Sequence, residues 1–152
     1  MDLKRPYQIF PLQGLDAVKF GMSAAEVAAQ FGSPAHTLKN FTGETIDSWG
    51  AATVSYSSDN QTVVEIGFSR QLSGVFLNSI HLFSQDSRQV IDALLVLAGE
   101  AYEGKGFFVF PTLGISLSGF LHADESDKTA TVFQQGRWDS LIKKMNRITK
   151  LA

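Results

Sequence analysis

The sequence predicts an α+β domain built on an antiparallel sheet, with helices packed on one face. Three observations lead to this fold class. A short helix with clear start and stop signals lies within residues 20–34, and several later segments alternate apolar and polar residues as β-strands do. The order of elements in the first half also returns in the second half.

The composition limits the class of protein. A chain of 152 residues with 44% hydrophobic residues and 12 phenylalanines fits one compact domain with a substantial core. The net charge of −2 gives no electrostatic reason to expect nucleic-acid binding. The absence of cysteine excludes a disulfide scaffold and thiol catalysis and is typical of a reducing compartment. With no signal peptide and no stretch long enough to span a membrane, we expect a cytoplasmic protein.

The first helix has the most complete local signals. Ser23 is placed as the N-cap, and Glu26 follows three residues later, as in a capping box. Val27 and Phe31 are four residues apart and therefore share one face. Gly32 and the proline that follows it predict the end of the helix.

The rest of the first half is predicted to be extended. Residues 1–14 form a lead-in that contains two prolines, and residues 36–47 form a loop or weak strand. Residues 53–57 and 61–69 alternate on either side of the polar turn 58–60, so they predict a β-hairpin.

The second half repeats this order. Asp86 or Ser87 is predicted to cap a helix over residues 88–102, which follows a short strand at 75–83. Further strands are expected at 107–110, 114–122 and 129–135, and a C-terminal helix at 138–150. We therefore expect a single domain, 1–152, in which two related α-ββ units, 15–70 and 75–136, join their strands into one sheet.

The opening of the first unit resembles a known family. Residues 20–34 are similar to the opening motif of the β-lactamase-inhibitor-protein-like superfamily, which includes small outer-membrane assembly lipoproteins and tandem-repeat inhibitor proteins. The matching positions are Gly21, Met22, Ser23, Glu26, Val27, Gly32 and Pro34. The second half lacks the motif, and the chain has none of the disulfides of the secreted inhibitors. The resemblance implies the fold and a habit of binding proteins, for which a cytoplasmic counterpart is a bacterial immunity protein.

Sequence motifs for catalysis are absent. The three histidines show no metal-ligand spacing, no serine lies in a nucleophile-elbow motif, and no glycine-rich segment has phosphate-loop spacing. His122 lies beside three acidic residues, which permits a metal or acid–base pair, although a solvated hairpin tip explains the same residues. We expect no catalytic residue, no metal and no cofactor.

One face of the predicted sheet mixes hydroxyls with aromatics, as protein-recognition surfaces do. The candidate partner-binding residues on this face and the adjoining acidic turn are Glu65, Ser116, Ser118, Phe120, His122, Phe133, Asp124, Glu125 and Asp127. Two alternatives stay open: the C-terminal helix covers this face, or a register shift of one residue exchanges the two faces.

The sequence thus favours a non-catalytic immunity or inhibitor protein that occludes a toxin or enzyme. Its acidic residues would face a basic target, because complementary charge speeds association. One alternative is an assembly or adaptor module of the cell envelope. Another is a small ligand-binding protein or enzyme with a cavity between sheet and helices.

Overall fold

The computed structural model describes residues 1–122 and 125–152 and has a mixed α+β architecture dominated by antiparallel strands. The strands of the first half are β1 (Tyr7–Phe10), β2 (Gly14–Leu15), β3 (Val18–Lys19), β4 (His36–Lys39), β5 (Thr45–Ser48), β6 (Ala52–Tyr56) and β7 (Val63–Ser69). Those of the second half are β8 (Val75–Leu77), β9 (Ile80–His81), β10 (Ala101–Gly104), β11 (Phe107–Phe110), β12 (Ile115–Ser118), β13 (Thr129–Phe133) and β14 (Asn146–Ile148). The helices are α1 (Ala24–Phe31), α2 (Ser87–Ala98) and α3 (Asp139–Ile142), with a 3-10 turn, η1, at Glu125–Asp127.

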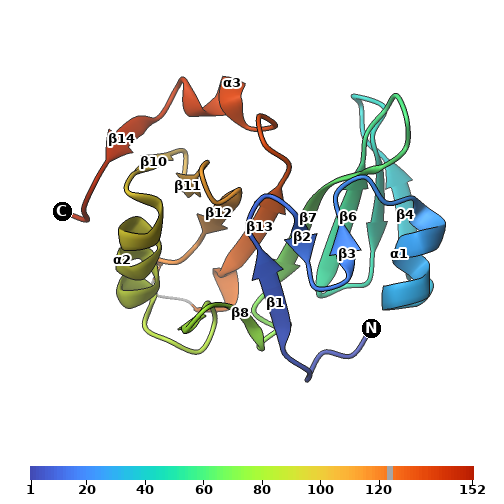
Figure 1. Ribbon diagram of the computed structural model, residues 1–152, viewed down its shortest axis with the longest axis horizontal. Helices are drawn as coiled ribbons and strands as arrows, with labels where there is room; N and C mark the ends of the chain where they lie inside the picture. The colour runs from blue at the N-terminus through green and yellow to red at the C-terminus, as the bar shows by residue number, and fades with distance from the viewer. Residues whose placement is uncertain (123–124) are drawn as a thin grey trace.

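The larger sheet has nine strands in the order β14-β10-β11-β12-β13-β7-β6-β5-β4. Apart from β14 at one edge, it consists of two antiparallel meanders, β4–β7 and β10–β13, which meet where β7 pairs with β13. In that pair Gly67 lies opposite Thr131 at the centre. Figure 1 shows β7 and β13 in the middle of the molecule, with α1 and α2 towards opposite ends.

A smaller sheet has the order β3-β2-β1-β8-β9, in which the three antiparallel strands β1–β3 and the hairpin of β8 and β9 are joined by parallel pairing of β1 with β8. Buried side chains of both sheets and both long helices form one hydrophobic cluster, which includes Ile9, Phe31, Ile66, Leu94 and Val132. The alternation in β7 places Ile66 and Phe68 in this core and leaves Glu65 and Gly67 on the opposite face.

Local signals account for both long helices. Ser23 and Glu26 form the expected capping box of α1, with both reciprocal hydrogen bonds present. Asp86 caps α2 by accepting from the Gln89 N–H. The helix expected over residues 88–102 ends instead at Ala98, because Gly99 adopts a left-handed φ of 86° and the chain then enters β10.

The C-terminal helix expected over residues 138–150 is wrong in extent. Helix α3 has only four residues, and Asn146–Ile148 forms β14, which pairs with β10 at one edge of the larger sheet. Ile148 packs against the core from this strand. Pairing with β10 therefore overrides the helical spacing of the apolar residues in this segment.

The expected hairpin is present as β6 and β7, and the last predicted strand is present as β13. Each half has more strands than the expected α-ββ unit, since β4 and β5 precede β6, and β10 and β11 precede β12. No helix in the described part of the chain is long and apolar enough to cross a membrane.

Candidate interaction face of the larger sheet

The face of the larger sheet that carries Glu65 is named here the outer face. The register places Glu65 opposite Phe133, Gly67 opposite Thr131 and Ser69 opposite Thr129 on this side. The neighbouring strands continue the face with hydroxyl and apolar side chains. These are Thr53 and Ser55 on β6, Ile46 on β5, Leu38 on β4, and Ser116 and Ser118 on β12.

The C-terminal segment covers part of the outer face. The ring of Trp138 stacks on Phe133 with centroids 5.3 Å apart and meets Phe107 edge-on at 5.5 Å. Phe133 is therefore buried, with 1% of its surface exposed. Ser116 is also only 1% exposed, and Ser118 is half-buried. These candidates do share one face, but Ser116 is buried and a partner has no access to Phe133 while Trp138 is stacked on it.

Phe120 is not on the outer face. It follows β12 and is 2% exposed, with its ring 5.9 Å from that of Phe83 and the Lys128 Nζ 5.4 Å above it. The chain leaves the strand at Ser118 and turns at Gly119, whose φ is 77°. The strict alternation expected to continue to His122 therefore stops, and Phe120 enters the core instead.

The acidic turn is described in part. His122 and Asp127 are exposed, with Nδ1 and Oδ2 3.3 Å apart. Asp124 lies outside the described residues, and Glu125 is the first residue of η1. In the described part of the chain, no three histidine or carboxylate side chains gather as a metal site would require.

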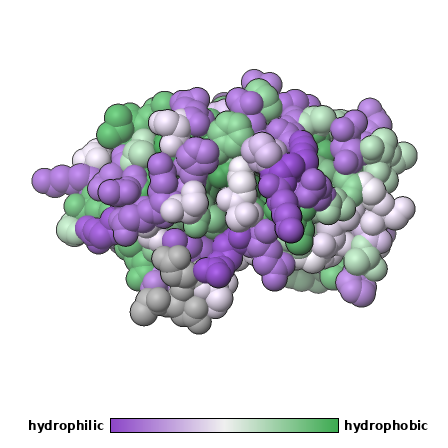
Figure 2. Space-filling model, turned by 90° about the horizontal axis from the view of Figure 1, so that it is seen from below, coloured by the Kyte–Doolittle hydropathy of each residue, from purple (hydrophilic) through white to green (hydrophobic). Residues whose placement is uncertain are grey.

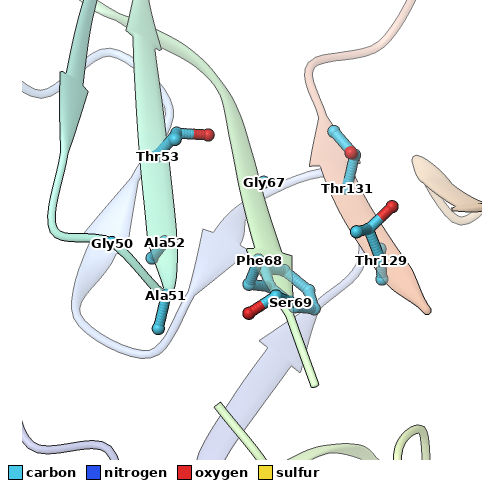
Figure 3. Close-up of a pocket in the computed structure, with 10 residues that line it drawn as sticks. Gly50, Ala51, Ala52, Thr53, Gly67, Phe68, Ser69, Thr129 and Thr131 are labelled. Atoms are coloured by element: carbon cyan, nitrogen blue, oxygen red, sulfur yellow. The ribbon is translucent and has the colours of Figure 1, made fainter. Parts of the chain in front are cut away.

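A shallow groove crosses the centre of the outer face at Gly67. It encloses about 300 Å³ and is lined by residues of β6, β7 and β13 and of the turn before β6. Figure 3 shows Thr53 and Thr131 on either side of Gly67, with Ser69 and Thr129 further along the same strands. A Cβ on Gly67 would lie 3.0 Å from the Thr53 Oγ1 and 3.8 Å from the Thr131 Oγ1. The missing side chain therefore creates the hollow, and two hydroxyls border it.

A second depression, named here the arginine cleft, lies beyond Glu65 on the same face. It encloses about 410 Å³ and is lined by Asn40, Phe41, Thr42, Glu44, Glu65, Arg137, Trp138 and Leu141. Glu65 and Gly67 are two residues apart on one side of β7, a separation of about 7 Å along a strand. The groove and the arginine cleft are thus neighbouring depressions along one strand.

Arg137 holds the arginine cleft together. Its Nη1 and Nη2 donate to the two carboxylate oxygens of Glu44 at 2.7 and 2.9 Å, and its Nε donates to the Glu65 Oε1 at 2.9 Å. The indole Nε1 of Trp138 donates to the same Glu65 oxygen at 2.9 Å. This network fastens the C-terminal segment to β7 and to the turn between β4 and β5.

The charges of this network reinforce one another. Hydrogen bonding to Arg137 holds the pKa of Glu44 below its ordinary value, against the opposing effect of burial. The bond to Glu44 also raises the pKa of the Arg137 guanidinium, to which the charge of Glu65 contributes. Both partners therefore remain ionised at neutral pH.

Phe41 projects from the rim of the arginine cleft and is fully exposed, at 101% of its reference area. The Asn40 Oδ1 accepts hydrogen bonds from the Thr42 N–H, the Glu44 N–H and the Thr42 hydroxyl, which fixes the turn that presents Phe41. Leu38, on the adjoining strand, is 54% exposed. Exposed apolar side chains on a rigid turn are typical of interaction surfaces.

Sequence reasoning identified Glu65 but missed Phe41, Gly67, Arg137 and Trp138. A usable signal existed for Gly67, because an isolated glycine inside an alternating strand often marks close approach of another group. No signal in the sequence pointed to the pairing of Arg137 with Glu44, since 93 residues separate them.

Comparison with protein-family models, curated proteins and solved structures finds no match. The family resemblance of residues 20–34 therefore stays a prediction from the opening motif.

The side of the molecule seen from below in Figure 2 is mainly polar. Hydrophilic side chains are prominent there, with apolar ones among them. The groove, the arginine cleft and the exposed Phe41 at its rim lie on or beside the outer face.

Proposed function

We propose that this protein is a non-catalytic protein-binding module that uses the outer face to occlude its target, as a bacterial immunity or inhibitor protein does. The observation that carries the proposal is the uncovered part of the outer face. There, Leu38 of β4, Ile46 of β5 and Thr53 of β6 are at least partly exposed beside a fully exposed Phe41. A partly open sheet face with hydroxyls, depressions and an exposed aromatic side chain on a hydrogen-bonded turn suits recognition of a protein surface.

We further propose that the chain contains two related units. In support, Leu15-Asp16-Ala17-Val18 is similar to Leu77-Asn78-Ser79-Ile80, and each segment forms a tight hairpin before a helix. Asp16 and Asn78 even adopt the same left-handed φ, 52° and 53°. In each half a side-chain-capped helix then precedes a four-stranded antiparallel meander. Duplication with fusion of the two meanders would produce the wide sheet that the proposed function needs.

The test is capture of the partner by variants of the outer face. Purified tagged protein is used as bait in a lysate of the source cell, and the captured protein is then assayed with and without the bait. Gly67→Val fills the groove with a side chain suited to a strand, and the nearest obstacle, the Thr53 hydroxyl, is on a rotatable side chain. Val96→Ala is the control, because Val96 is 86% exposed on α2, outside both depressions.

We expect the wild type and Val96→Ala to capture one protein and inhibit its activity stoichiometrically, and Gly67→Val to lose both effects. Circular dichroism should show the same fold for all three. Equal capture by all three would remove the outer face from the proposal. Failure of the wild type to capture any protein over several growth conditions would remove the proposed function itself.

A further inference from the structure

We propose that the arginine cleft receives a cationic side chain, an arginine or a lysine, from the protein partner. The inference rests on the proposed function and adds the chemistry of the contact. It depends on the charge of the cleft, on the hydrogen bonds of Glu65 and on the aromatic side chains around it.

The lining of the arginine cleft has a net negative charge. Of the residues that line it, Glu44 and Glu65 are acidic and Arg137 is basic, so one carboxylate charge is left uncompensated. The carboxylates are 18% and 23% exposed, so water screens them less than it would screen surface charges. A cation entering here would meet a net attraction, whereas an anion would be repelled.

The carboxylate of Glu65 can accept further hydrogen bonds. Within the described part of the chain, the bonds it accepts from Arg137 and from Trp138 both end on Oε1. A carboxylate offers about four lone-pair positions on two oxygens. Oε2 is thus suited to accept a charge-assisted hydrogen bond from an incoming guanidinium or ammonium group.

The aromatic side chains suit the rest of such a side chain. Trp138 is held in place by stacking on Phe133 and by its bond to Glu65. Phe41 stands on a turn fixed by three hydrogen bonds to the Asn40 Oδ1. Arginine and lysine place aliphatic stems along apolar surface and their cationic groups over aromatic rings, so both parts of the side chain find a complement here.

The experiment uses the two indole N–H signals in a ¹⁵N–¹H spectrum of the intact protein. Trp138 reports on the cleft, while the Trp49 Nε1 donates to the Gly32 carbonyl at 3.0 Å and serves as an internal control. The probe is N-acetyl-arginine amide, and N-acetyl-citrulline amide is its uncharged match. We expect the arginine compound to shift the Trp138 signal saturably at millimolar concentration, with Trp49 unmoved and citrulline without effect.

Two variants sharpen the result. Phe41→Ala removes a side chain with no buried surface and should weaken binding of the arginine compound by about two- to fivefold. Leu38→Ala removes an exposed apolar side chain from β4, outside the lining, and should leave binding unchanged. Equal shifts with citrulline, equal shifts of both indoles, or no shift would overturn the assignment. If Gly67→Val still abolishes partner capture in that case, the proposed function stands and only the cationic contact falls.

Discussion

Arg137 is the single residue on which the organisation of the outer face depends most. It extends from the C-terminal segment to β7 and to the turn between β4 and β5, and it is only 23% exposed. Ion pairs at the surface contribute little because water and salt screen them, but this one is two-thirds or more shielded and bidentate. Its loss would remove the three hydrogen bonds that join the C-terminal segment to Glu44 in the turn and to Glu65 on β7.

The stability contributed by Glu44 should depend on pH in a defined direction. Arg137 lowers the pKa of Glu44 in the folded state, so the contribution is complete above the ordinary glutamate pKa and is lost as the pH falls through the folded value. We expect Glu44→Gln to lower the free energy of unfolding by about 1–2 kcal/mol at pH 7. This difference should shrink steadily below the ordinary pKa.

Urea titrations from pH 7 down to pH 3 measure this difference. Asp92→Asn, which changes an exposed carboxylate on α2, is the matched control and should leave stability nearly unchanged throughout. A Glu44→Gln deficit that persists undiminished at pH 3 would show that the amide disrupts packing and that the ion pair is not the cause.

Because Phe120 and Phe133 are buried, the expected effect of an alanine substitution on stability is the reverse of the one that the sequence implied. As exposed binding residues they would tolerate alanine, whereas at 2% and 1% exposure each is part of the packed interior. Truncating a buried phenylalanine typically costs about 3–5 kcal/mol. We expect both alanine variants to melt many degrees lower than the wild type in a calorimeter, and Phe41→Ala to melt at the wild-type temperature. Unchanged melting of either buried variant would mean that its ring is exposed in solution.

Among the elements, those with complete local signals were predictable from sequence. Helix α1 has both its capping box and its terminating glycine in the sequence, and strand β7 alternates over its length. Elements that depend on a distant partner were missed. Strand β14 lies in a segment expected to be helical, because it is extended only through pairing with β10, which is remote in sequence. The first two residues of β10 were also expected to be helical, although its partner β11 is the next strand along the chain.

On the outer face, too, local patterns were predictable from the sequence and contacts between distant segments were not. The side on which Glu65 and Phe133 lie was predictable, because alternation and pairing place residues two apart on one side of a strand. The part of this face that stays exposed to solvent was not predictable. It depends on where Trp138 stacks after the chain turns back at the end of β13. One of the two alternatives was that a long C-terminal helix covers this face. The C-terminal segment does cover part of it, but with the short helix α3 and the indole ring of Trp138.

At the scale of the whole molecule, the two halves share one interior. The hydrophobic cluster includes Val54 and Ile66 from the first meander and Ile115 and Val132 from the second. Pairing of β7 with β13 makes the backbone of the larger sheet continuous between them, and β1 with β8 does the same for the smaller sheet. Neither half could separate without exposing apolar side chains and unpaired strand edges.

This continuity predicts a single cooperative unfolding transition. Trp49 packs against Phe31 of α1 in the first half, and Trp138 packs against Phe133 of β13 in the second, so the two tryptophans monitor opposite halves. In Trp138→Phe and in Trp49→Phe, the midpoint of urea unfolding by fluorescence should coincide with the midpoint by circular dichroism in the same variant. Comparing probes within each variant removes any effect of the substitution on stability. A fluorescence transition that precedes the dichroism transition in one variant would show that its half unfolds separately, and the shared interior would then not couple the two meanders.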